Sequence, residues 1–140
     1  MSAVVKFDLA EIKDKASLMA ALSSMGMKEL QESDANALSV TGYYGNEWGK
    51  ATVNVPRSAN GLCADIGFNR EGDGFQMLID HIDESRLDRT NGGTSGSFRE
   101  SLNMWYNAHY SAQTLELQGY TTSVQKQQNG ELRLTATVYA

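Results

Sequence analysis

The sequence predicts an α+β domain with a single antiparallel β-sheet and two α-helices packed on one face. The main observation is a pattern that occurs twice, in which an amphipathic helix ends at a glycine and strand-like sequence follows. The first copy is a helix over 17–25 followed by Gly26, and the second is a helix over 98–118 followed by Gly119. A helix packed on its own hairpin is half of a small two-layer domain. We therefore expect one domain, residues 1–140, made of two duplicated helix–hairpin halves.

The two helices are predicted from apolar residues that repeat every three or four positions along one face. Gly26 and Gly119 are well placed to end them, because glycine readily adopts the left-handed conformation that closes many helices. Ser97 and Glu100 have the spacing of a capping box, so the second helix should begin just after Ser97. The apolar faces contain Leu18, Leu22 and Met25 in the first helix and Phe98, Leu102 and Trp105 in the second.

Alternating apolar residues predict two β-hairpins. The alternation runs over 64–68 and again over 75–79, with a glycine-containing turn at 70–74 between them. The second hairpin turns at Asn129-Gly130, a dipeptide typical of tight hairpin turns. The predicted core consists of Leu18, Leu22, Met25, Ile66, Phe68, Met77, Ile79, Leu102, Trp105, Leu132 and Leu134.

Composition excludes several classes of function. The net charge is −5, whereas binding to nucleic acid or to an anionic membrane depends on basic surface. No apolar run approaches the roughly 20 residues that cross a bilayer. The single cysteine, Cys63, rules out multi-cysteine zinc sites. We expect a cytoplasmic protein that binds no nucleic acid, membrane, metal or cofactor.

Two segments are predicted as partner-binding surfaces. Tyr43, Tyr44 and Trp48 gather in a turn-rich stretch, where they either cover the sheet or, if exposed, bind a partner at little entropic cost. The second segment, 81–96, is polar and is predicted as a long loop with one helical turn; long loops are often functional. The candidate contact residues in that loop are Arg86, Asp88 and Arg89.

A ligand pocket between the long helix and the sheet is the alternative hypothesis. Its candidate residues are Asp65, Tyr106 and His109, since Tyr106 and His109 offer flat faces with polar groups. The more common role of such residues is structural, as a hydrogen-bonded aromatic core. The glycine-rich segment 92–97 precedes a helix start that could favour an anion, but it lacks the P-loop lysine.

Two further groupings are weaker candidates. Asp80, His81 and Asp83 are metal-capable, but adjacent residues on a strand point to opposite faces, so a solvated loop is the favoured interpretation. Cys63 could be a nucleophile with His81 or His109 as its base, although a partly buried structural cysteine is the simpler reading. We assign no catalytic residue and expect a binding protein rather than an enzyme.

Three stretches of the chain resemble the domain of unknown function 1257 family, found in plastids, cyanobacteria and some phages, whose plastid member is hypothetical chloroplast open reading frame 35. The stretches are 12–27, 64–80 and 102–134, with Met25-Gly26-Met27 and Gly119-Tyr120 among their motifs. The segment 84–97 and Ala3 depart from the family pattern. The resemblance implies a small cytosolic or stromal protein, or one in the host cytoplasm if phage-encoded, and it implies no reaction.

The leading functional hypothesis is therefore a non-enzymatic interaction or regulatory accessory protein that docks on a larger host or phage complex. The first alternative is a protein that binds a nucleotide or metabolite in the pocket described above. The second is a virion or assembly component, which would be a homo-oligomer.

Overall fold

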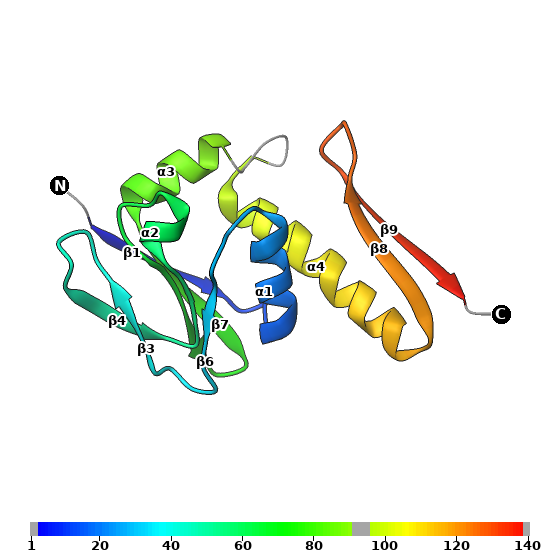
Figure 1. Ribbon diagram of the computed structural model, residues 1–140, viewed down its shortest axis with the longest axis horizontal. Coiled ribbons are helices and arrows are strands. Elements are labelled where there is room, and N and C mark those ends of the chain that lie inside the picture. The colour runs from blue at the N-terminus through cyan, green and yellow to red at the C-terminus, as the bar shows by residue number, and fades with distance from the viewer. Residues whose placement is uncertain (1–2, 91–95, 139–140) are drawn as a thin grey trace.

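The computed structural model describes residues 3–90 and 96–138 of the chain, and Figure 1 shows how their elements are arranged. The elements in chain order are β1 (Val4–Leu9), α1 (Lys15–Ser24), β2 (Gln31–Glu32), β3 (Leu38–Thr41), β4 (Glu47–Ala51), β5 (Val53–Val55), α2 (Arg57–Asn60), β6 (Ile66–Glu71), β7 (Gly74–Asp80), α3 (His81–Thr90), α4 (Phe98–Leu117), β8 (Tyr120–Lys126) and β9 (Leu132–Val138).

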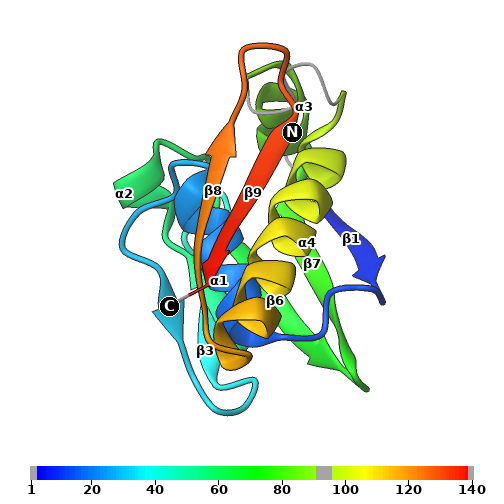
Figure 2. The ribbon, with the colours of Figure 1, turned by 90° about the vertical axis from the view of Figure 1, so that its right-hand side faces the viewer.

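The central feature is a five-stranded antiparallel sheet with the strand order β1-β7-β6-β5-β2. Its middle is the predicted β6–β7 hairpin, in which Phe68 lies opposite Met77. Helices α1 and α4 pack against one face of this sheet and bury the main core (Figures 1 and 2). Seven of the predicted core residues are fully buried there, namely Leu18, Leu22, Ile66, Phe68, Met77, Ile79 and Leu102. Met25 and Trp105 are half-buried at its margin.

The opposite face of the sheet is covered by the β3–β4 hairpin, which forms a sheet of its own. Glycines allow the close approach. A Cβ atom on Gly67 would lie 2.5 Å from Cγ2 of Val40, and one on Gly49 would lie 2.7 Å from Cδ2 of Leu78. Val40 is a buried, β-branched side chain with little freedom to move aside. Both faces of the first half of β6 and of most of β7 are therefore enclosed, which explains why residues 66–68 and all but one residue of β7 are buried.

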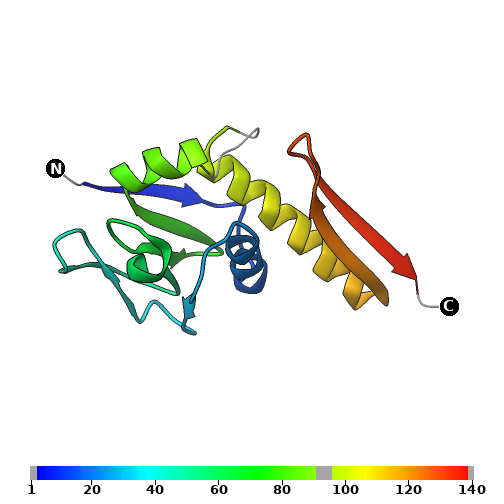
Figure 3. The same cartoon turned by 45° about the horizontal axis from the view of Figure 1, so that its top comes forward.

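Helix α4 begins as the capping box predicts, because the backbone N–H of Glu100 donates to Oγ of Ser97 at 3.1 Å. At 20 residues it is about 30 Å long and continues past the sheet. The β8–β9 hairpin packs on this extended part of α4, at one end of the molecule (Figure 3). Leu132 and Leu134 are consequently half-buried against α4 and do not belong to the main core.

The predicted architecture of a single sheet with two helices is wrong. The described residues form four helices, a five-stranded sheet and two separate two-stranded sheets. The two predicted halves are not equivalent either. The segment directly after α1 forms the two-residue strand β2 in the central sheet and then β3 in a separate sheet, whereas the hairpin after α4 stays outside the central sheet as a unit. The physical reason is the length of α4, which carries its hairpin beyond the reach of the central strands.

The prediction of a loop over 81–96 is wrong for its first ten residues, which form α3. Asp83 and Leu87 are its buried residues, one turn apart. Asp83 and Glu84 lie in the first turn, and Arg89 lies in the last turn together with Asp88. The acidic first turn complements the helix dipole and was the signal for a helix that the sequence offered. Positions 91–95, which include most of the proposed phosphate-binding segment, lie outside the described residues.

Candidate partner-binding site

The turn between β3 and β4 presents two tyrosines to solvent. We call residues 42–48 the aromatic turn. The side chains of Tyr43 and Tyr44 are 48% and 77% exposed, and their rings meet edge to face with centroids 5.0 Å apart. The turn itself is closed by the N–H of Gly42, which donates to the carbonyl of Asn46 at 2.7 Å. Gly45 has a φ of 84°, which few residues other than glycine adopt easily.

Arg57, at the start of α2, fixes this turn to the body of the protein. Its Nη1 donates to the carbonyl oxygens of Gly42 at 2.9 Å, Tyr43 at 3.1 Å and Cys63 at 3.2 Å. A guanidinium group has several donors in a fixed plane, so one side chain can hold several carbonyls at once. The backbone that carries the tyrosines is thus ordered before any partner arrives.

The buried carboxylate of Asp65 holds the same region through three hydrogen bonds. Its carboxylate accepts hydrogen bonds from the N–H of Thr41 at 2.9 Å, the N–H of Arg57 at 2.8 Å and Nδ2 of Asn54 at 3.1 Å. The residue is only 6% exposed. Asp65 was a candidate ligand-binding residue from the sequence. The structure places its carboxylate among these three donors, where it positions the aromatic turn and α2.

Trp48 behaves differently from the two tyrosines. It is half-buried, and its ring lies over Gly42, where an added Cβ would be 3.1 Å from Cε3 of the indole. Its Nε1 atom is buried without a hydrogen-bond partner among residues 3–90 and 96–138. The tyrosines are therefore exposed and the tryptophan folds back onto Gly42, while a role for any of the three in partner binding stays a prediction.

The other two candidate ligand residues lie along α4, in contact with different ends of α1. The hydroxyl of Tyr106 accepts the N–H groups of Lys13 and Asp14, at 3.0 and 2.9 Å, and the residue is 4% exposed. His109 contacts Ser24 at the other end of α1, with 2.7 Å between Nε2 and Oγ, and stacks on Trp105. None of the cavities found among the described residues is lined jointly by Asp65, Tyr106 and His109.

His109 gives a prediction for pH dependence. Burial lowers the pKa of His109 below its ordinary value of 6.5, although the charge of Glu116 opposes this. The unfolded chain then binds a proton more readily than the folded one, so the stabilising contribution is complete above pH 6.5 and is lost as pH falls through the folded pKa. Chemical denaturation at several pH values on both sides of 6.5 should show that the free energy of unfolding falls as pH falls. The His109→Gln substitution should reduce this dependence on pH. His81→Gln is the matched control, and an equal reduction there would contradict the assignment.

The candidate residues on α3 make internal contacts. Nη2 of Arg86 donates to Oδ1 of Asp83 at 2.9 Å and to the carbonyl of Gly61 at 3.1 Å. Oδ1 of Asp88 accepts the N–H of Phe98 at 2.8 Å and so helps to start α4. Arg89 is exposed. The first two side chains thus connect α3 to its surroundings, and a role for any of them in partner binding stays a prediction.

Neither of the weaker groupings assembles a reactive site. The described residues contain no group of three or more metal-capable side chains placed to hold an ion. Asp83 is fully buried and accepts the N–H groups of Cys63 and Ala64 at 2.9 and 3.0 Å. Burial, and then the nearby charge of Asp83, raise the pKa of the Cys63 thiol. A thiol with a raised pKa is protonated near neutral pH, which is the opposite of nucleophile activation.

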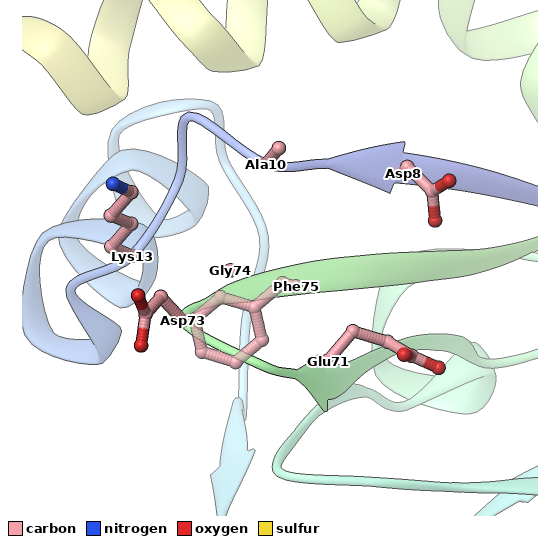
Figure 4. Close-up of a pocket in the computed structure, with 7 residues that line it drawn as sticks. All are labelled: Asp8, Ala10, Lys13, Glu71, Asp73, Gly74 and Phe75. Carbon is pink, nitrogen blue, oxygen red and sulfur yellow. The ribbon is translucent and has the colours of Figure 1, made fainter.

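A hollow of about 450 Å³ lies where β1 ends and β6 turns into β7 (Figure 4). Asp8 and Glu71 stand toward one end of it and Lys13 and Asp73 toward the other. Arg70 packs over the ring of Phe75 beside it, 4.0 Å from the ring centre, and donates to the carbonyls of Lys13 and Asp73. The lining residues are Asp8, Ala10, Lys13, Glu71, Asp73, Gly74 and Phe75, a mixed-charge surface distinct from the aromatic turn.

Comparison with protein families gives one match. The model of the family described as protein of unknown function (DUF1257) matches residues 21–135, which is most of the chain. The protein belongs to the DUF1257 family. The match spans α1 to β9 and so includes the aromatic turn of this DUF1257 protein. The chain matches no curated protein and no solved structure. None of its described helices is both long enough and apolar enough to cross a membrane.

Proposed function

We propose that this DUF1257 protein is a non-enzymatic interaction module that docks on a larger complex through the aromatic turn. The observation that carries the proposal is the exposure of Tyr43 and Tyr44 on a backbone that Arg57 and Asp65 hold in place. Large aromatic side chains dominate many interfaces because they bury much area. A turn that is already ordered loses less entropy on binding, which favours affinity further.

The chemistry of the turn defines the kind of partner surface that it fits. Two tyrosine rings require an apolar depression, and their hydroxyl groups require hydrogen-bond partners at its rim. Glu47 and Lys50, at the base of the turn, pair with each other at 2.9 Å, so they add little net charge. The expected partner surface is therefore a largely neutral protein surface with an apolar centre, consistent with the acidic and non-basic character of the chain.

Substitution of the tyrosines tests this proposal. Tyr44→Ala should weaken partner binding by at least ~10-fold, as expected for an interface anchor. Tyr110→Ala is the matched control, because Tyr110 is also 50% exposed but lies on α4, away from the turn. Immobilised full-length protein would capture partners from host extract, and calorimetry with the identified partner would measure each affinity. Equal binding by Tyr44→Ala and the unsubstituted protein would overturn the proposed surface.

Trp48→Ala should also reduce binding, but for a different reason. Its ring packs against Gly42, so its removal loosens the backbone that carries the tyrosines. It removes no side chain that would itself contact the partner. The variant should be measured for both partner affinity and unfolding.

A further inference from the structure

The β8–β9 hairpin has an open edge. The two strands pair antiparallel, with Ser123 opposite Thr135 and Tyr120 opposite Val138. Next to the turn, the N–H of Gln127 donates to the carbonyl of Glu131 at 2.7 Å, which marks this as a hydrogen-bonded pair. Hydrogen-bonded and non-hydrogen-bonded pairs alternate in an antiparallel ladder. The backbone groups of the even-numbered residues of β9 therefore point away from β8, and these residues are Leu132, Leu134, Ala136 and Val138.

This edge carries few of the features that usually block strand addition. Among the described residues of β9 there is no proline, no glycine and no break in register, and the one charged residue is Arg133. Proteins commonly protect exposed edges with charges, prolines or bulges, because an open edge is a template for another strand. Val138, at the end of the strand, is 64% exposed. The backbone of this edge is therefore open to pairing with another strand.

A groove accompanies the edge. It has a volume of about 470 Å³ and lies between α4 and β9. Its lining residues are Met104, Asn107, Ala108, Ser111, Glu131, Leu132 and Leu134. A strand added to β9 would thus lie next to the side of α4 that lines the groove. Helix α4 supplies only uncharged side chains to this groove, and two of them, Ala108 and Ser111, are small enough to permit a close approach.

We propose that the occupant is a second copy of this chain, with its β9 antiparallel to the first across a two-fold axis. When Thr135 lies opposite Thr135 of the second copy, Leu134 falls opposite Ala136 and Leu132 opposite Val138. All of these pairs use the backbone groups that point outward. Arg133 then lies opposite Thr137, so no like charges meet. A register centred on Arg133 would place two arginines opposite each other, which is destabilising.

The dimensions of the hairpin favour the same assembly. Two strands spaced about 4.8 Å apart cover roughly the width of one helix, about 10 Å. Joining two hairpins at β9 gives a four-stranded sheet over two helices, one from each copy. A two-stranded sheet needs packing against a helix, which α4 provides here, and the four-stranded sheet would cover both helices with one continuous surface. The apolar face is already present, since alternate residues of β9 are Leu132, Leu134, Ala136 and Val138.

Cysteine crosslinking tests both the assembly and its register. In the proposed register Thr135 faces its own copy in a non-hydrogen-bonded pair, with Cα atoms about 4.5 Å apart, close enough for a disulfide. Full-length Thr135→Cys should form a covalent dimer with a mild oxidant. Ser123→Cys is the matched control, because Ser123 is the cross-strand neighbour on β8, one strand away from the axis. Both variants retain Cys63, so any reaction of that thiol appears in each. Equal crosslinking by both variants would overturn the register.

Charge substitution gives a second readout. Light scattering of the unsubstituted chain should show a concentration-dependent dimer in the micromolar range. Thr135→Lys and Thr135→Glu should each weaken the dimer several-fold, since like charges meet at the axis, and an equimolar mixture of the two should restore it. A chain that stays monomeric at high micromolar concentration would overturn the proposal. The open edge of β9 would then be available only to a strand of a different protein.

Discussion

Asp83→Ala should lower the free energy of unfolding by about 3 kcal/mol, because two buried backbone donors lose their acceptor at roughly 1–3 kcal/mol each. These donors are the N–H groups of Cys63 and Ala64, which Asp83 accepts at 2.9 and 3.0 Å in a fully buried position. Arg86 would lose its ion pair as well, although its side chain is 44% exposed and so regains water. The effect should appear as a lower midpoint in urea denaturation.

Two further variants separate this explanation from a general effect of charge. Asp83→Asn keeps one oxygen as an acceptor and should cost less than Asp83→Ala. Asp34→Ala removes a carboxylate whose side chain is fully exposed and whose contact with Lys15 is 3.8 Å long, so stability should hardly change. If Asp83→Ala were as stable as Asp34→Ala, the two N–H contacts would not be the reason for the buried carboxylate.

Asp65→Ala should have the second large effect, and it should act on binding as well as on folding. The carboxylate accepts the N–H groups of Thr41 and Arg57, which would lose this acceptor, and the side-chain amide of Asn54, which would keep its second contact with Gln31. We expect a loss of about 2–4 kcal/mol in unfolding free energy. The ends of the segments that carry Tyr43 and Arg57 are then no longer fixed to each other. Partner affinity should fall even though both tyrosines remain.

The control for this prediction is Asp65→Asn, which keeps one acceptor oxygen in place. It should retain more stability than Asp65→Ala and more partner affinity. Both quantities should be measured at a temperature where each variant is folded, by denaturation for the first and calorimetry for the second. Unchanged partner binding by folded Asp65→Ala would show that the order of the aromatic turn does not depend on this carboxylate.

The elements that the sequence predicted are those specified by local contacts. The start of α4 follows from Ser97 and Glu100, and the β6–β7 hairpin follows from alternation around a short turn. Helix α3 was missed because polar residues surround its two buried side chains, Asp83 and Leu87, and a polar composition resembles a loop. What identifies Asp83 as an interior residue is its contact with Cys63 and Ala64, some twenty positions earlier, which no local pattern reveals.

In the candidate site, too, only the features that depend on local sequence were predictable. The cluster of aromatic residues at 43–48 indicated a turn, and two of its three rings are exposed there, whereas partner binding by this turn stays a prediction. The supporting residues were not predictable in their roles. Arg57 reaches carbonyls about fifteen positions earlier, and Asp65 joins a strand end to a helix start. The separation of Asp65 from Tyr106 and His109 likewise depends on how the layers stack, because those two residues are held by α1.

The placement of the β8–β9 hairpin at the far end of α4 has a consequence for valency. The aromatic turn lies at the opposite end of the longest axis of the molecule (Figure 1). A partner bound at one end therefore leaves the other end accessible. A two-fold assembly through β9 would carry two aromatic turns pointing outward, and such a particle can bridge two copies of a partner. Simultaneous engagement would raise the apparent affinity through avidity, without any additional contact at either turn.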